Sequence, residues 1–356
     1  MTIRVGLIGL GEVAQLMHLP LLADDPRYRI EAVMDVAPSL VEHVGQRYGV
    51  SRRYLRPEDL LADKAVDAVF ILTPDHIHGR LLAQSMAADK HIFIEKPVCL
   101  TADELTPLVG PAERYGKTIF VGYMRRFSRP FLELKRLMPA VGEVQHARVR
   151  DIICEGPFFI RQTRNVFCPK DVPQEIIAEG RAETERLLRS VMGEGASREE
   201  LRAYQVLTGL SSHSFSAMRE LLGMPKAVAA ARQHRGEAVS VLFDYGHFTA
   251  VYEALIHNVA RFDAGIDILT DRQQFRLNYD TPYIRSLPSR LDITSSSDQE
   301  TETRTFGPVY EDPFRIELDA FHDCVVNGTP PKTTLADSAH DLALFAAVGR
   351  AFRSPG

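Results

Sequence analysis

The sequence predicts an α/β fold with two parts, an N-terminal doubly wound parallel sheet and a C-terminal α+β domain with a large, mostly antiparallel sheet. Strand and helix patterns alternate over the first third of the chain, whereas from Tyr123 onward strand-like runs are joined by turns instead of crossover helices. With 356 residues, 45% of them apolar, the chain is also long for one domain. We therefore expect two domains, residues 1–122 and 123–356.

The first element leads into the most informative turn of the chain. A β-prone run from Ile3 passes directly into the pattern Gly-x-Gly-x-x-Ala. Such glycines permit a tight turn and let backbone amides approach a pyrophosphate at a helix N-terminus, which is typical of a dinucleotide-binding Rossmann domain. Glycine-rich turns that bind nothing are the alternative for this motif alone. The residues expected at the cofactor are Gly9, Gly11, Glu12, Val13 and Ala14.

The second strand, Tyr28–Asp35, follows a helix from Leu16 to Ala23 and ends in a carboxylate. Asp35 falls near the distance expected for the group that accepts hydrogen bonds from the adenosine ribose, so we expect NAD. The carboxylate would repel a 2′-phosphate, and residues 36–38 offer no cation. Ser39 and Arg29 lie nearby in sequence, so NADP is disfavoured but not excluded. An acid at a helix entry is the alternative for Asp35.

The rest of the first domain continues the alternation. Strands are predicted at Val66–Leu72, His91–Glu95 and Thr118–Gly122, and the patterns Ser39-x-x-Glu42 and Thr101-x-x-Glu104 predict capping boxes that start helices. Continuous apolar runs of this kind are typical of parallel strands that are covered on both faces.

The second domain is predicted to contain a long insertion and two closing helices. The insertion covers about residues 158–205, with a helix at Pro173–Met192 and a capping box, Ser197-x-x-Glu200. The C-terminal helices span about residues 313–352, and the polar segment Leu291–Thr305 is predicted to be a surface loop. The predicted strands are Val144–Ile153, Val239–Phe243, His247–Tyr252, Gly265–Leu269 and Gln274–Leu277.

Composition argues against several other classes of function. The net charge of −5 is spread without like-charge blocks, which gives no reason to expect nucleic acid or an anionic membrane as a partner. No apolar run approaches a membrane span, and the strand that starts at Ile3 leaves no room for a signal peptide, so we expect a cytoplasmic protein. The four cysteines form no Cys-x-x-Cys pair and the 12 histidines no ligand cluster, so no metal site is expected.

Two polar motifs follow predicted strands. Thr73-Pro74-Asp75-His76-Ile77-His78 comes after the strand that starts at Val66, and Glu95-Lys96-Pro97 comes after the strand that starts at His91. Ligands of open parallel sheets bind beyond the carboxyl ends of the strands, so both motifs should line the same crevice as the glycine turn.

These motifs, in this order and spacing, make the chain resemble the Gfo/Idh/MocA oxidoreductases, the family of glucose-fructose oxidoreductase and inositol dehydrogenase. The resemblance extends over nearly the whole chain and includes Val121–Phe127 and the segment Asn327–Pro331 between the last two helices. It implies a nicotinamide-dependent enzyme that acts on a ring hydroxyl of a sugar or cyclitol. It also implies that Thr73, Pro74, His78, Glu95 and Lys96 contact the cofactor.

By the same resemblance Lys96 lies beside substrate and nicotinamide, where it would hydrogen-bond the reacting oxygen and help to move its proton. An exposed lysine at a strand end is the alternative. His213 is the expected second catalytic residue, because Gly209-Leu210-Ser211-Ser212-His213 matches the family's Asp-x-Gly-x-His segment. Glycine replaces the family's aspartate, which leaves His213 without its usual acid. A helix-start histidine with no catalytic role is the alternative there.

Substrate contacts and assembly are less specific. Tyr123, Arg125 and Arg126 lie where the two predicted domains meet in the sequence and could contact substrate or cofactor. Arg161 and Arg164 in the insertion could bind a carboxylate or phosphate of the substrate, although loop arginines are usually solvated. The insertion suggests a lid or an oligomer contact. The resemblance implies a homodimer or homotetramer.

Two other functions stay open: transient oxidation that leads to elimination or epimerisation with NAD regenerated in place, and a non-catalytic sensor of NAD and a sugar.

Overall fold

The computed structural model describes residues 1–163 and 166–353. It divides into two compact units, which we describe separately. Unit 1 comprises Met1–Gly122, Arg164–Leu187 and Glu317–Ala339, and unit 2 comprises Tyr123–Thr163, Leu188–Ile316 and His340–Gly356. Part of the predicted insertion and part of the C-terminal helix pair are thus grouped with the first 122 residues, so in this division the second unit is not one continuous stretch.

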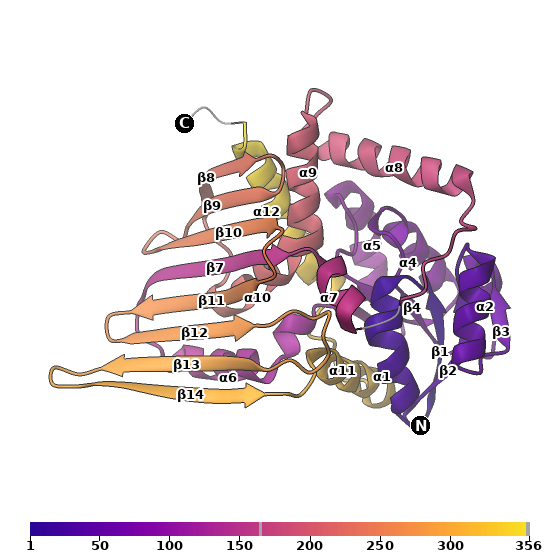
Figure 1. Ribbon diagram of the computed structural model, residues 1–356, viewed down its shortest axis with the longest axis horizontal. Helices are drawn as coiled ribbons and strands as arrows, with labels where there is room; N and C mark the ends of the chain where they lie inside the picture. Colours follow the sequence, from indigo (N-terminus) through magenta and orange to yellow (C-terminus); the bar gives the residue numbers. More distant parts are fainter. Residues whose placement is uncertain (164–165, 354–356) are drawn as a thin grey trace. The chain divides into compact units, whose positions relative to one another are not determined.

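Unit 1 is built on a parallel sheet in the order β3-β2-β1-β4-β5-β6, which has six strands in the part of the chain that the structure describes (Figure 1). This is the doubly wound order of a dinucleotide-binding domain, and it confirms the predicted fold class. The short third strand was not predicted. The strands are β1 (Ile3–Ile8), β2 (Tyr28–Met34), β3 (Arg52–Tyr54), β4 (Ala68–Ile71), β5 (His91–Glu95) and β6 (Ile119–Gly122).

Aromatic rings fill the core beside this sheet. The Phe70 and Phe93 rings stack with centroids 4.7 Å apart, and Phe93 and Phe120 stack at 5.5 Å, one ring from each of three neighbouring strands. Phe321 from α11 (Pro313–Asn327) meets all three edge-on. Because these side chains are almost fully buried, they fix the strands whose ends carry the polar motifs.

The helices of unit 1 follow the predicted order. The first helix differs from the prediction in its type, because it begins as a π-helix, η1 (Ala14–His18), and continues as α1 (Leu19–Asp24). The others are α2 (Pro38–Arg47), α3 (Pro57–Ala62), η2 (Asp75–Ile77), α4 (His78–Ala87) and α5 (Ala102–Glu113).

Of the two capping boxes predicted in unit 1, one forms. The Thr101 side chain accepts from the Glu104 amide and the Glu104 carboxylate accepts from the Thr101 amide, as predicted. The box predicted at Ser39 is wrong, because Ala37 is the N-cap of α2 and Pro38 its first residue. Proline is well suited to that first position, which leaves Ser39 inside the first turn.

Unit 2 contains a mostly antiparallel sheet in the order β14-β13-β12-β11-β7-β10-β9-β8, with eight strands among the described residues (Figure 1). Only β7 and β10 pair in parallel within it. The strands are β7 (Val144–Cys154), β8 (Ala227–His234), β9 (Ala238–Asp244), β10 (Thr249–His257), β11 (Phe262–Thr270), β12 (Gln273–Tyr279), β13 (Ser289–Ser296) and β14 (Thr301–Val309).

The surface loop predicted at Leu291–Thr305 is wrong, since this segment forms most of the β13–β14 hairpin. Leu291 and Ile293 are buried on one face, which is the period-two pattern of a strand. Hydroxyl pairs join the two strands, including Ser296 and Thr301 at 2.9 Å. The polar composition that suggested a loop belongs to an edge hairpin whose outer strand is largely exposed.

Helices cover one face of the unit 2 sheet. Helix α6 (Arg129–Leu137) packs against β12, β13 and β14, and α10 (Ser212–Leu222) packs against β7 and β11. The remaining helical segments, some of them shared with unit 1, are η3 (Met124–Phe127), η4 (Met138–Ala140), α7 (Gly156–Thr163), α8 (Gln174–Met192), α9 (Arg198–Val206), η5 (Leu207–Ser211) and α12 (Leu335–Ala351). None of the described helices is long and apolar enough to cross a membrane.

The other face of this sheet carries charged pairs. Arg148 and Glu253 on neighbouring strands form a 2.7 Å ion pair, and Arg150 contacts Asp267 at 2.8 Å and Asp263 at 3.1 Å. A sheet face that carries ion pairs between neighbouring strands is not apolar. The chemistry of this face therefore does not require that a partner cover it.

Candidate functional site

The glycine turn after β1 needs its first glycine. Gly9 has φ of 91°, and a Cβ added there would lie 2.7 Å from the Leu72 carbonyl oxygen and 2.9 Å from Thr73 Cγ2. Only glycine tolerates that backbone conformation and this close approach to the end of β4. At Gly11, by contrast, an added Cβ would meet no atom within 4 Å. Gly9 is therefore packed closely against the end of β4, whereas the space beside Gly11 is empty. A pyrophosphate that approaches the turn needs such a space.

The helix that follows starts at this turn. The Gln15 amide donates to the Gly11 carbonyl at 3.0 Å, while Glu12 and Val13 remain exposed and Ala14 is buried against the sheet. Backbone amides at a helix N-terminus form an anion site, so the predicted residues fit a dinucleotide here.

Asp35, just beyond β2, joins the turn to the next helix. Its Oδ2 accepts from the Leu10 amide at 2.9 Å and its Oδ1 accepts from the Ala37 amide at 3.0 Å. Burial raises the pKa of Asp35, and these backbone hydrogen bonds partly oppose the rise. The carboxylate thus lies at the glycine turn, where the sequence predicted it.

Arg29 lies at the opposite end of the same strand. It pairs in register with Arg4 near the start of β1 and forms an ion pair with Glu31. Six residue steps, about 20 Å at roughly 3.3 Å per step, lead from Arg29 to Asp35. Arg29 is therefore not placed to meet a phosphate on a ribose held by Asp35.

The two strand-end motifs are tied together in unit 1 by His78. Its ring nitrogens lie 2.8 Å from the Thr73 carbonyl oxygen and 2.7 Å from the Pro97 carbonyl oxygen, and the side chain is buried. His78 thus fixes the backbone of both motifs relative to each other. The Thr73 hydroxyl is buried and has no hydrogen-bond partner among the described residues, which makes it a polar group suited to a cofactor in this crevice.

Glu95 and Lys96 follow β5 at the same edge of the sheet. The Glu95 carboxylate lies 2.8 Å from His18 Nε2 and accepts from the Lys96 amide at 3.2 Å, so it holds the backbone at the lysine. Lys96 itself is half-buried. Sequence reasoning missed His18, because a single histidine on the buried face of a helix belongs to no motif.

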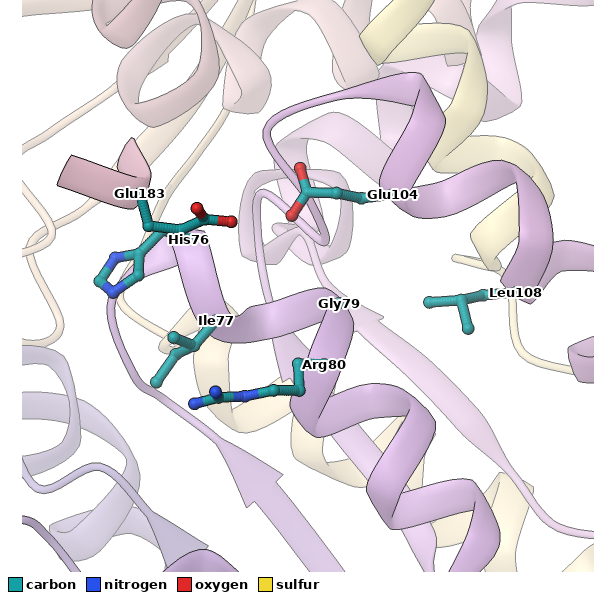
Figure 2. Close-up of a pocket in the computed structure, with 7 residues that line it drawn as sticks. All are labelled: His76, Ile77, Gly79, Arg80, Glu104, Leu108 and Glu183. Carbon is teal, nitrogen blue, oxygen red and sulfur yellow. The ribbon is translucent and has the colours of Figure 1, made fainter. Parts of the chain in front are cut away.

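A cavity of about 360 Å³ opens elsewhere on unit 1 (Figure 2). In the figure His76 and Glu183 lie on one side of it, Arg80 below and Glu104 opposite. It is formed by η2, α4, α5 and α8, and its lining contains none of the predicted cofactor residues, so it is separate from the glycine turn. Its lining residues are His76, Ile77, Gly79, Arg80, Glu104, Leu108 and Glu183.

In unit 2, His213 lies in the first turn of α10, directly after the π-helical segment η5. Helices α9, η5 and α10 run on without a break, so His213 lies within a continuous helical run, not at the free helix start that the sequence suggested. π-Helical turns are frequent at functional sites. A Cβ added at Gly209, inside this segment, would meet no atom within 4 Å, so the family's aspartate would have room there.

A buried polar network surrounds the start of α10. Arg125 Nη1 donates to Asp151 at 2.6 Å and to the Ser214 hydroxyl at 2.8 Å, and the Tyr252 hydroxyl donates to Asp151 at 2.9 Å and lies 2.6 Å from Ser211 Oγ. Asp151 and Tyr252 are fully buried. Their charges and hydroxyls satisfy one another, which fixes the residues on both sides of His213. No sequence motif marked Asp151 or Tyr252.

The predicted substrate residues of unit 2 lie in different surroundings. The Tyr123 hydroxyl donates to Asp341 at 2.8 Å, and Arg126 is buried against Glu220 and over the Tyr123 ring. A ligand would have to replace these partners. Arg161 is exposed on α7. Arg164 lies outside the described residues.

Comparisons with known proteins agree with the fold and the motifs. Residues 3–123 match the model of the oxidoreductase family with an NAD-binding Rossmann fold, GFO_IDH_MocA. A myo-inositol 2-dehydrogenase of Thermotoga maritima is 31% identical over 134 residues, which is 37% of this chain and 39% of that protein. An NAD⁺-dependent scyllo-inositol 2-dehydrogenase of Bacillus subtilis is 25% identical over 99% of this chain and 94% of its own length. The chain spans less than half the length of the first curated relatives that it matches.

Solved structures show the same fold over the whole chain. A 3-ketoreductase from Actinomadura kijaniata, in complex with NADP, is similar with a TM-score of 0.74 at 17% identity over 99% of this chain and 98% of that one. A putative NADPH-dependent oxidoreductase from Desulfitobacterium hafniense gives a TM-score of 0.78 at 18% identity, covering 99% and 96%. Taken with the glycine turn, Asp35 and the strand-end motifs, these findings confirm the resemblance to the Gfo/Idh/MocA oxidoreductase family, whose NAD-binding domain residues 3–123 match.

Proposed function

We propose that this protein is an NAD-dependent oxidoreductase that transfers a hydride between nicotinamide and a ring hydroxyl or ketone of a sugar, glycoside or cyclitol. The observation that carries the proposal is the crevice at the carboxyl ends of β1, β2 and β4, where Asp35 is fixed beside the open glycine turn and Thr73 offers a buried hydroxyl. The printed names of the inositol dehydrogenase relatives support the substrate class.

Each residue has a defined task in this proposal. The nicotinamide, when bound, supplies the hydride acceptor or donor. The amides of the glycine turn hold the pyrophosphate, and Asp35 accepts hydrogen bonds from the ribose hydroxyls. Lys96 hydrogen-bonds the reacting oxygen and stabilises negative charge there, and His213 takes or returns the hydroxyl proton.

The preference for NAD rests on residues of this chain. Relatives include both an NAD⁺-dependent and an NADP⁺-dependent scyllo-inositol 2-dehydrogenase, so similarity alone does not choose. Asp35 repels a 2′-phosphate, and Arg29, the nearby cation considered from the sequence, lies at the far end of β2.

One observation favours a second function. Glycine stands at position 209, where many relatives of this family carry an aspartate by the resemblance described above, and a protein without that acid could bind NAD and a sugar as a sensor. The intact Glu95-Lys96-Pro97 motif and His213 favour the enzyme. Transient oxidation, with NAD regenerated in place, uses the same residues.

A substrate panel separates these functions. The protein is mixed with NAD and, in turn, with sugars, inositols and glycosides while NADH absorbance is followed. Net NADH formation supports the dehydrogenase. Product without net NADH, from cofactor that co-purifies and does not exchange, supports transient oxidation. Saturable sugar binding without any product supports the sensor and contradicts the proposed enzyme.

We also propose that the protein forms a homodimer or homotetramer, on the basis of the family resemblance. The charged pair of Arg148 and Glu253, on the face of the unit 2 sheet opposite α6 and α10, would then be expected to lie in a polar interface. Light scattering that reports a monomer at micromolar concentration would contradict this.

A further inference from the structure

Residues 166–171, which we name the strap, lie against the glycine turn within unit 1. The Gln15 side chain binds the strap twice, because its Nε2 donates to the Phe167 carbonyl at 3.1 Å and its Oε1 accepts from the Phe167 amide at 2.9 Å. The same Nε2 donates to the Leu10 carbonyl at 2.9 Å. One side chain thus joins the strap to the turn where Asp35 is also bound.

Two further contacts hold the strap on α2. The Phe167 ring stacks on His43 with centroids 4.4 Å apart and planes inclined by 14°. The Asp171 carboxylate accepts from the Ser39 amide at 2.8 Å and from the Ser39 hydroxyl at 2.5 Å. These hydrogen bonds lower the pKa of Asp171, so the group is charged at neutral pH.

The contact between Ser39 and Asp171 lies beside the expected binding site of the adenosine ribose. Ser39 is the second residue of α2 and follows Asp35 by four positions, so its amide points out of the helix N-terminus beside the ribose site. An amide and a hydroxyl there are suitable donors for a phosphate on the ribose. Asp171 occupies both donors with a carboxylate. Its charge also acts on Asp35, raising the pKa of that carboxyl.

We propose that Asp171 is a cofactor-specificity residue: the strap places its carboxylate where the 2′-phosphate of NADP(H) would bind, and so admits NAD(H) and excludes NADP(H). This inference rests on the proposed function. Asp171 would thus act together with Asp35. A 2′-phosphate would be repelled by both carboxylates, and the amide and hydroxyl of Ser39 would already be bound to Asp171. A mismatched charge is an effective way to reject a competing ligand.

The test compares charge removal at Asp171 with a matched change nearby. Kd values for NADH and NADPH are measured from nicotinamide fluorescence with the full chain, which contains no tryptophan to interfere. Asp171→Asn should tighten NADPH binding about tenfold and leave NADH binding within about twofold, because only the phosphate meets the charge. Glu175→Gln removes an equal charge from an exposed position just beyond the strap and should change neither value.

A second variant tests the Ser39 donors. If the phosphate uses the hydroxyl that Asp171 releases, Ser39→Ala combined with Asp171→Asn should lose most of the gain in NADPH affinity. The discrimination of the unmodified protein should also weaken as salt rises, because the Asp171 carboxylate is exposed and the screening length is about 8 Å at physiological ionic strength.

The outcomes separate this inference from the proposed function. If the unmodified protein binds NADH well and Asp171→Asn leaves the NADH-to-NADPH ratio unchanged, the inference is wrong and the proposed function stands. If Asp171→Asn weakens both cofactors equally while thermal unfolding is unchanged, the strap only supports the site and the inference is again wrong. If the unmodified protein binds neither dinucleotide, both proposals are wrong.

Discussion

The two units build their candidate sites in different ways. In unit 1 the polar groups come from consecutive motifs at the ends of neighbouring strands, and each mainly positions backbone: Asp35 holds the glycine turn, and His78 holds two strand ends. In unit 2 the groups beside His213 come from η3, β7, β10 and α10 and hold one another as side chains. Sites of the first kind are visible in sequence, and sites of the second kind are not.

The largest expected effect concerns the residue that each unit contributes to the proposed chemistry. Lys96→Ala and His213→Ala should each lower turnover by about two to four orders of magnitude, because general acid–base groups contribute that much. NAD binding should stay almost unchanged, since neither residue is assigned to the adenosine half. Steady-state kinetics with the substrate found by the panel, and NADH titration, measure both. Full activity in His213→Ala would remove His213 from the mechanism.

The next prediction concerns the side-chain network of unit 2. Asp151→Ala should lower the free energy of unfolding by about 3–5 kcal/mol, because it leaves the Arg125 charge buried without its partner. The matched control is Glu253→Ala, which removes the partner of Arg148, an exposed residue on the same strand as Asp151, and should cost about 1 kcal/mol or less. Urea unfolding measures both values. Equal costs would show that the buried network does not stabilise unit 2.

A smaller effect is expected when the family's acid is restored. Gly209→Asp places a carboxylate four residues before His213 on the continuous helix, in open space. It should raise the pKa of His213, since a nearby negative charge favours the protonated ring. If neutral His213 accepts the proton, the rising limb of turnover against pH should move upward by the same amount. Gly209→Asn is the uncharged control, and an equal shift in both variants would exclude an electrostatic cause.

The smallest effect compares a capping box that forms with one that does not. Ser197→Ala should lower the free energy of unfolding by about 1 kcal/mol, because its hydroxyl accepts from the Glu200 amide at the start of α9. Ser39→Ala should cost less, since Ser39 is not the cap of α2 and its contact with Asp171 is exposed. A larger cost at Ser39 than at Ser197 would mean that the strap is a major source of stability.

The sequence predicted the parts of the molecule that depend on local pattern. The parallel strands, the glycine turn, the cap at Thr101 and the helix that became Gln174–Met192 all follow from neighbours in the chain. The hairpin β13–β14 was missed because most of its residues are polar. Only one face of β13 is buried, and the edge strand β14 is almost entirely exposed, so the segment lacks the apolar run of a buried strand. The cap predicted at Ser39 failed because Pro38 starts the helix one residue earlier.

The unpredicted parts of the candidate site depend on residues far apart in the chain. The contact between His18 and Glu95 joins positions 77 residues apart, and the contact between Ser39 and Asp171 joins positions 132 apart. No spacing rule relates such pairs, because only the fold brings them together. The sequence suggested that the insertion could be a lid or an oligomer contact, and the structure places its strap on the glycine turn.

The π-helical segment Leu207–Ser211 holds one more residue than an ordinary α-helical turn would need at this place in the chain. A π-turn holds one more residue than an α-turn, so loss of a single residue between Val206 and Ser212 could be absorbed by an ordinary α-helix. If the same residues instead continued as an ordinary α-helix, every residue after the segment would be rotated by about 100° around the helix axis, at roughly 3.6 residues per turn. Because the π-turn takes up the extra residue, helix α10 keeps its direction on the sheet of unit 2. The direction in which His213 faces therefore depends on whether this segment is a π-turn as much as on the chemistry of its residues.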